Sequence, residues 1–109
     1  VNGDGSITRD YIYVSDICNA IYKSIKDTSG AKTYHVGTGK ETSIKELIRI
    51  FKKECINHNI SIKFGSNRVG DMRKNYTSIT KIKKHLKWSP KMPLQKGFSQ
   101  TFKWFLSQK

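Results

Sequence analysis

The stretch that decides the fold is residues 3–16, which read GDGSITRDYIYVSD. Its first four residues pair two glycines with an aspartate and a serine, a composition typical of a tight turn. Residues 8–14 are rich in aromatic and β-branched side chains, which favour a β-strand. Ser15 is a residue type that caps helices, and Asp16 would lie in the first turn of the helix that follows. The stretch therefore predicts a turn, a strand and the start of a helix.

The alternation of short strands and helices continues to the C-terminus. Residues 33–37 and 60–64 predict two further short strands. Helices are predicted over residues 43–55, 78–86 and 94–106, where apolar side chains recur at helical spacing. The second helix opens with a capping box, a serine followed three residues later by a glutamate. The sequence therefore predicts one small α/β domain, residues 1–109, with three short strands and about four helices.

Apolar periodicity also predicts which side chains are buried. The first helix carries its apolar residues at positions that would face a core: Ile17, Ala20, Ile21 and Ile25. Cys18 and Cys55 lie far apart among apolar residues, without a second cysteine or a histidine at metal-ligand spacing. We expect both to be small buried thiols in a reducing cytoplasm.

The chain is strongly basic, with 21 Lys and Arg against 8 Asp and Glu and a net charge of +13. Such a charge attracts polyanions, including nucleic acid, anionic membranes and phosphorylated ligands. Most lysines fall on the polar faces of the predicted helices, which favours a solvated surface. No nucleic-acid recognition motif, signal peptide or membrane-spanning run is present. We therefore expect a cytoplasmic chain without a membrane partner. Because it opens on Val inside a turn, it reads as a segment of a longer protein.

Arginines are the candidate ligand-binding residues. Arg9 opens the first predicted strand, and Arg68 and Arg73 lie in a polar loop. Two guanidinium groups that converge from separate segments suit a diphosphate, since each can bind phosphate oxygens with two parallel hydrogen bonds. The alternative is that these arginines form surface ion pairs with Asp10 and Asp71.

Other short motifs are interpreted without catalytic roles. Gly37-Thr38-Gly39 lies between a predicted strand and a helix, but a third glycine is missing, so we interpret it as a helix-entry turn rather than a dinucleotide-binding loop. Tyr22 and Lys26 match the Tyr-x-x-x-Lys spacing by coincidence. The three histidines lack metal-ligand spacing. His35 lies at a strand end, where ligands meet α/β sheets, although a structural or solvated role is the alternative.

Taken in order, the motifs resemble one family. Residues 3–16 resemble the GDGxxxRDxxxVxD segment of extended short-chain dehydrogenases, which include NAD-dependent nucleotide-sugar epimerases and dehydratases such as UDP-glucose 4-epimerase. Further matches are YHVGTG at 34–39 before SIKEL at 43–47, RVGD at 68–71, Tyr76 with SITK at 78–81, and LKWSP at 86–90. The resemblance covers essentially the whole chain.

The resemblance implies a substrate-binding role for this chain, as the C-terminal portion of a Rossmann-type enzyme. Arg9 and Arg68 match the two arginines that grip the diphosphate of a nucleotide-sugar such as a UDP-sugar. Asp71 matches an acidic residue near the nucleoside. His35 stands where many members carry Asn near the ligand, and Tyr76 matches a position near that pocket. Ser15, where Asp is common, departs from the family pattern.

The resemblance also implies a cofactor and a partner. In the family, NAD bound by an N-terminal Rossmann half accepts a hydride from the sugar C4 while a tyrosinate removes the hydroxyl proton. That half is absent from these 109 residues, so the chain by itself is expected to be inactive. The expected function is the substrate-binding part of a nucleotide-sugar 4-epimerase. The alternatives are part of a dTDP-glucose 4,6-dehydratase-type enzyme, or a free-standing basic module that binds nucleic acid.

Overall fold

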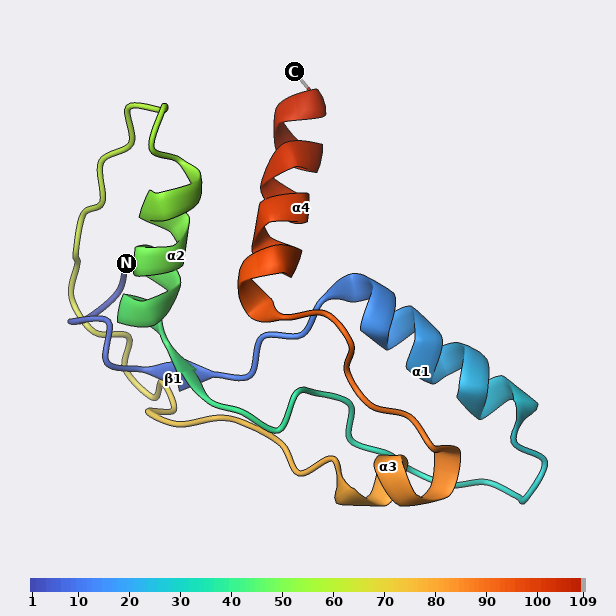
Figure 1. Ribbon diagram of the computed structural model, residues 1–109. Coiled ribbons are helices and arrows are strands. Elements are labelled where there is room, and N and C mark those ends of the chain that lie inside the picture. The colour runs from blue at the N-terminus through green and yellow to red at the C-terminus, as the bar shows by residue number, and fades with distance from the viewer. Residues whose placement is uncertain (109) are drawn as a thin grey trace.

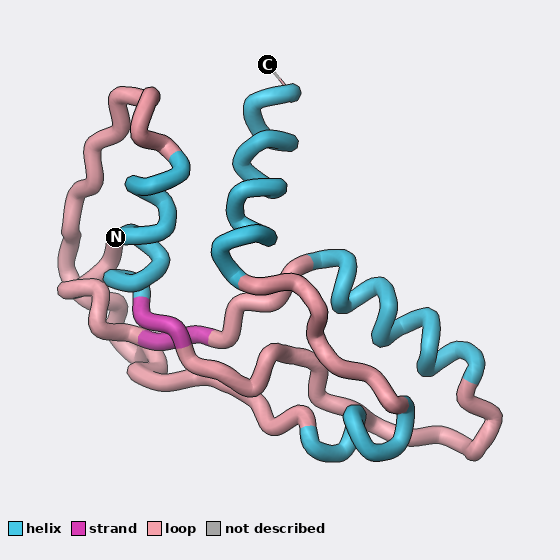
Figure 2. Tube along the Cα trace, in the orientation of Figure 1, coloured by secondary structure: helices cyan, strands magenta, loops and turns pink. Residues whose placement is uncertain are grey.

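The computed structural model describes residues 1–108, which form an α/β chain of four helices and two very short strands (Figures 1 and 2). The elements, in chain order, are β1 (Thr8–Arg9), α1 (Val14–Lys26), β2 (Thr42–Ser43), α2 (Ile44–Glu54), α3 (Thr80–Leu86) and α4 (Leu94–Ser107). Helices α2 and α4 lie side by side at one end of the molecule, and α1 and α3 lie at the other (Figure 1). The predicted fold class and the four helices are confirmed.

The sheet is smaller than the sequence predicts. β1 and β2 pair antiparallel, with Thr8 opposite Ser43 and Arg9 opposite Thr42. β1 includes only the first two residues of the predicted strand over 8–14. β2 lies where a turn and the helix cap were expected, because the residues just before α2 pass directly beside β1.

Two predicted strands, at residues 33–37 and 60–64, do not form. Both segments are irregular and mostly exposed, and within residues 1–108 neither joins a sheet. A strand needs a neighbour for its backbone N–H and C=O groups, and apolar composition alone does not supply one. The second segment ends next to a single parallel bridge between Asn2 and Gly65.

The helix starts show where capping was predictable. Ser43 caps α2, and its hydroxyl accepts a hydrogen bond from the backbone N–H of Glu46 at 3.1 Å. The predicted caps of α1 and α3 are wrong. α1 begins two residues early, with Tyr13 rather than Ser15 at the N-cap, and Ile79 stands at the N-cap of α3. Neither cap makes a side-chain hydrogen bond.

The buried side of α1 also differs from the prediction. Ala20 is buried as expected, but Ile21 is 53% exposed and Ile25 is 75% exposed. Cys18 on this helix is exposed, contrary to the predicted buried thiol, whereas Cys55 is buried and burial raises its thiol pKa. The reason is that the buried side of α1 is selected by Asp16 rather than by the isoleucines.

Asp16 fastens α1 to the segment before α4. Its carboxylate is buried and accepts hydrogen bonds from the backbone N–H groups of Lys91 and Met92, both at 3.0 Å. The indole Nε1–H of Trp88 donates to the carbonyl of Asp16 at 3.0 Å. Because this anchor turns Ala20 inward, the small core on this side contains Ala20, Ile82 and Trp88. Leu86 and Tyr34 pack at its edge.

Residues 1–108 form an elongated rather than a compact, globular shape. Its radius of gyration is 16.6 Å, and its principal extents are 50 × 35 × 19 Å. A compact domain of this length would have a radius of gyration of about 13 Å. The accessible surface is 8261 Å², against roughly 6200 Å² for a typical folded monomer of this mass. The fold therefore leaves much apolar surface uncovered.

Candidate functional site

Arg9 and Asp71, two of the predicted site residues, meet directly. Arg9 Nη2 lies 2.5 Å from Asp71 Oδ1, and Arg9 Nη1 donates to the carbonyl oxygens of Met72 at 2.7 Å and Thr8 at 2.8 Å. Both side chains are a little under 30% exposed. The ion pair fixes the polar loop against β1, so the surface-pair alternative is confirmed for Asp71. An arginine fork has five N–H donors, and the three bonds here leave about two for a ligand.

The loop that carries Asp71 folds back on itself. The backbone N–H of Asp71 donates to the carbonyl of Arg68 at 3.3 Å, and Gly70 has a φ of 80°, a conformation that glycine adopts without strain. The turn places Arg68 and Asp71 on one cavity of about 330 Å³, which we call the arginine cavity. Its full lining is Asp4, Ser6, Ile7, Asn67, Arg68, Asp71 and Arg73. This volume is at the lower end of the range of ligand pockets, which runs from about 300 to 1,000 Å³.

The N-terminal turn contributes Asp4 and Ser6 to the lining of the cavity. Asp4 Oδ1 accepts hydrogen bonds from the Ser6 hydroxyl at 2.6 Å and the Ser6 backbone N–H at 2.9 Å. These hydrogen bonds lower the pKa of Asp4 below its ordinary value, so its carboxylate is ionised at neutral pH. The motif that predicted a turn thus also adds an acidic group to the cavity.

Asp10 points the opposite way from Arg9, as neighbours on an extended chain do. Its carboxylate accepts hydrogen bonds from the Thr38 N–H at 2.9 Å, the Thr38 hydroxyl, the Gly39 N–H at 3.0 Å and the Thr77 N–H at 3.4 Å. The alternative in which Asp10 pairs with an arginine is therefore wrong. Asp10 instead holds two distant segments against the β1 region.

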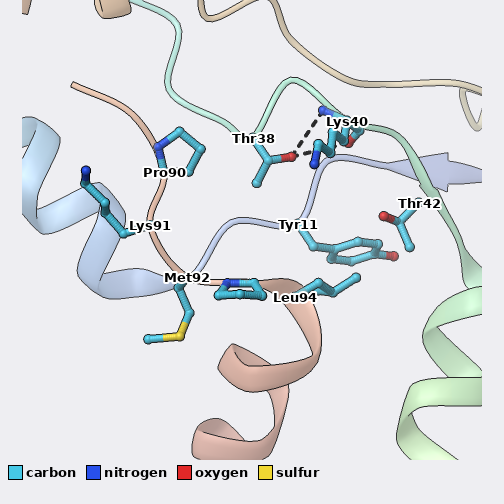
Figure 3. A pocket seen from close by; sticks show the side chains of 9 residues that line it. Tyr11, Thr38, Lys40, Thr42, Pro90, Lys91, Met92 and Leu94 are labelled. Atoms are coloured by element: carbon cyan, nitrogen blue, oxygen red, sulfur yellow. Dashed lines mark hydrogen bonds between the residues drawn. The ribbon is translucent and has the colours of Figure 1, made fainter. Parts of the chain in front are cut away.

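Tyr11, the residue after Asp10, lines a second cavity of about 290 Å³ (Figure 3). The Tyr11 ring and the side chains of Thr42 and Leu94 border it, and burial raises the pKa of the Tyr11 hydroxyl. Thr38 and Lys40 close one side, and the Lys40 N–H donates to the Thr38 hydroxyl at 3.2 Å (Figure 3). Three successive residues of one extended segment thus have different roles: Arg9 binds Asp71 of the first cavity, Asp10 joins two distant segments, and Tyr11 borders the second cavity.

Two predicted site residues lie apart from the arginines. His35 is exposed on the irregular segment before Gly37, and Tyr76 is 56% exposed. Neither lines the arginine cavity. Sequence reasoning did not assign Asp4, Ser6 or Asn67 to the site. The signal was weak, because these are common turn and loop residues.

Neither a metal site nor a dinucleotide site is formed by the described residues. Within residues 1–108, no group of three or more His, Cys, Asp or Glu side chains could hold a metal ion. The Gly37–Gly39 turn does not fit NAD. The Thr38 and Gly39 N–H groups, which a pyrophosphate would need, donate to Asp10 instead. A Cβ atom at Gly37 would lie 2.6 Å from Asp10 Oδ2, so this glycine makes room for Asp10.

None of the helices formed within residues 1–108 combines the length and the apolar character that crossing a bilayer requires.

Comparisons with known proteins identify the family. Residues 1–101 match the family described as GDP-mannose 4,6 dehydratase. UDP-glucose 4-epimerase of Mycolicibacterium smegmatis is 33% identical over 103 residues, which cover 94% of this chain and 33% of that protein. The structure of UDP-glucose 4-epimerase from Thermotoga maritima with UDP-glucose superposes with a TM-score of 0.87 and 29% identity, over 99% of this chain and 34% of that one.

A more distant structure shares the same fold. MoeE5 in complex with UDP-glucose and NAD superposes with a TM-score of 0.91 at 23% identity, over 99% of this chain and 36% of that one. This chain thus spans about a third of the length of the proteins that it matches. It belongs to the GDP-mannose 4,6 dehydratase family of nucleotide-sugar epimerases and dehydratases, in agreement with the resemblance of its motifs.

Proposed function

We propose that this chain, residues 1–109, is the nucleotide-sugar-binding part of a nucleotide-sugar 4-epimerase, with the diphosphate held by Arg9 and Arg68. The observation that carries the proposal is the cavity of about 330 Å³ in which Arg68 and Asp71 meet the N-terminal turn, with Arg9 paired to its lining residue Asp71. Similar chains support the choice of substrate, since the Mycolicibacterium protein is a UDP-glucose 4-epimerase and the Thermotoga epimerase was solved with UDP-glucose.

The two arginines would act in different ways. Arg9 is already held by Asp71 and by the carbonyl of Met72, so it offers its remaining N–H groups in a fixed orientation. Arg68 makes no side-chain hydrogen bond or ion pair within residues 1–108, so its whole fork is available to phosphate oxygens. Together they would position the sugar for reaction, and positioning of this kind lowers a barrier without chemistry by the arginines themselves.

Asp71, His35 and Tyr76 would contact the nucleotide or the sugar rather than the diphosphate. Asp71 could accept a hydrogen bond from a ribose or base through the carboxylate oxygen that does not face Arg9. His35 and Tyr76 are exposed outside the cavity, so they would reach a ligand only where it extends beyond the diphosphate. We keep all three as proposed contacts of the nucleotide or sugar.

The partner would be a nucleotide-binding Rossmann half, which in such an enzyme brings NAD for hydride transfer. The open shape of the chain and the outer face of α1 support this proposal. That face presents four apolar side chains, at 61%, 36%, 53% and 75% exposure: Val14, Ile17, Ile21 and Ile25. An uncovered stripe of this kind marks an interaction surface. The chain by itself would bind substrate without transforming it.

A dehydratase is the second candidate for the whole enzyme. The match of residues 1–101 to the GDP-mannose 4,6 dehydratase family favours it. Both reactions use a nucleotide-sugar, so the arginine cavity would serve either one in the same way.

Calorimetric titration of the 109-residue chain with UDP-glucose tests the binding role. We expect saturable binding that Arg68→Met weakens roughly tenfold to a hundredfold, since a charge-assisted hydrogen bond contributes about 1.5–3 kcal/mol. Arg49→Met is the matched control, because Arg49 pairs with Glu46 on α2 outside the cavity. Binding of UDP-glucose that Arg68→Met leaves unchanged would contradict the proposal. Tight binding of a random oligonucleotide at high salt would favour a nucleic-acid module instead.

A further inference from the structure

A third arginine, Arg73, lines the same cavity as Arg68 and Asp71. Its backbone is fixed, because its carbonyl accepts a hydrogen bond from the Thr8 N–H at 2.9 Å and thereby extends the pairing at β1. Its side chain is exposed. Within residues 1–108 the Arg73 guanidinium makes no hydrogen bond or ion pair. Arg73 therefore presents a free cation from a fixed backbone position.

The charges around the cavity show why this cation matters. Asp71 is neutralised by Arg9 at 2.5 Å. Asp4 is ionised, with Lys45 as a nearby cation, so the cavity lining carries its negative charge as well as the positive charge of Arg68. Counted over the lining side chains and Arg9 alone, the formal charges would cancel without Arg73. A neutral cavity attracts an anion poorly, whereas one uncompensated guanidinium raises the local concentration of anions.

The loop brings the two free arginines to one cavity from opposite ends of a short turn. The turn from Arg68 to Asp71 reverses the chain, and Arg73 follows beside β1. Each guanidinium is a planar fork that matches two oxygens of one phosphate group. Two such forks on one cavity suit two adjacent phosphate groups better than a single one.

We propose that Arg73 is a diphosphate-binding residue, which gives the cavity its net positive charge and its preference for a diphosphate over a monophosphate. This proposal rests on the proposed nucleotide-sugar-binding function and adds a residue and a selectivity to it. Arg73 adds a further fork to those of Arg68 and Arg9, and Arg9 keeps its ion pair with Asp71 while its remaining N–H groups serve the diphosphate.

The test compares UDP with UMP as ligands of the 109-residue chain, by calorimetry at fixed ionic strength. Arg73→Met is expected to weaken UDP binding about tenfold or more and UMP binding much less, so that the ratio of the two affinities falls. Arg73→Lys keeps the charge without the fork and is expected to recover only part of the loss. Arg49→Met removes an equal charge from a residue of α2 that does not line the cavity, and it serves as the control. Far-UV circular dichroism checks that each variant is folded.

Each outcome decides the proposal. A fall in the ratio for Arg73→Met, with partial recovery in Arg73→Lys, supports it. If Arg73→Met weakens UDP binding no more than Arg49→Met does, the role of Arg73 is refuted while the binding function stands. If Arg73→Met weakens the binding of UDP and the binding of UMP by the same factor, the preference for a diphosphate is refuted. If the unsubstituted chain binds neither UDP nor UDP-glucose, the proposed function fails, and the role of Arg73 fails with it.

Discussion

Helices α1 and α2 follow similar extended segments, yet they choose their buried faces by opposite means. α2 buries an apolar residue, Ile50, and places Phe51 edge-on against Phe98 and Phe102 of α4, with ring centroids 5.5 and 6.5 Å apart. α1 buries Asp16 and Ala20 and exposes its isoleucines. Hydrophobic pattern therefore orients α2, whereas a buried carboxylate orients α1. Because Asp16 orients α1, the apolar stripe of this helix stays exposed and can pack against another domain.

The largest expected effect tests the anchor of α1. Trp88 is 1% exposed and donates to the Asp16 carbonyl, whereas Trp104 on α4 is 62% exposed. Trp88→Ala should lower the free energy of unfolding by about 3–5 kcal/mol, because it removes a large buried ring and leaves a cavity. Trp104→Ala should cost less than about 1 kcal/mol. Urea denaturation followed by circular dichroism measures both. Equal losses would mean that α1 is not anchored through Trp88.

A second pair of substitutions separates the two faces of α1. Ile82 of α3 is 2% exposed and packs with Ala20, while Ile21 is 53% exposed on the outer face. Ile82→Ala should destabilise the chain by about 2–4 kcal/mol, and Ile21→Ala by roughly 0.5 kcal/mol or less. The same denaturation experiment measures the difference. A large loss for Ile21→Ala would show that the outer face is already covered in the free chain.

The smallest expected effect concerns the start of α2. Hydrogen bonds from Arg49, at 2.6 and 3.0 Å, hold the pKa of Glu46 below its ordinary value. A carboxylate with a lowered folded-state pKa stabilises the fold above its unfolded-state pKa, and that contribution is lost as pH falls through the folded-state pKa. The Glu46 side chain is 43% exposed, and solvent screens its pair with Arg49, so the effect is slight.

The measurement is the fall in melting temperature between pH 7 and pH 3. Glu46→Gln should show a slightly smaller fall than the unsubstituted chain, since it has no carboxylate to protonate at this position. Glu54→Gln on the same helix is the control, because Glu54 makes no ion pair within residues 1–108. A fall in Glu46→Gln equal to that of the unsubstituted chain would show that the Arg49 pair does not contribute to stability.

The sequence predicts those features of the fold that depend on neighbours along the chain. The cap of α2 is one, since Ser43 and Glu46 are three residues apart. The orientation of α1 is not, because the partners of Asp16 lie 75 and 76 positions away. Residues 33–37 have the composition of a strand but no neighbour to pair with. Composition predicts the tendency, and pairing depends on the rest of the fold.

In the candidate site, too, the sequence predicts what depends on local motifs and misses what depends on distant contacts. The motifs point to Arg9, Arg68 and Asp71, and the structure pairs Arg9 with Asp71, which lines the same cavity as Arg68. They do not show that Asp71 already pairs with Arg9, because that contact spans 62 positions. Nor do they show that Asp4 enters the cavity and changes its charge. A motif identifies residue types, whereas the balance of charge depends on which segments meet.

The bonds of Asp10 have a consequence for how fast the chain folds. Its carboxylate reaches residues 28, 29 and 67 positions away along the chain. The cost in chain entropy of closing a loop rises with its length, and proteins rich in such distant contacts fold more slowly than those with local ones. The four helices can form early from local interactions. The β1 region, on which the arginine cavity depends, is complete only after the long loops have closed, so the site is among the last parts of the molecule to appear.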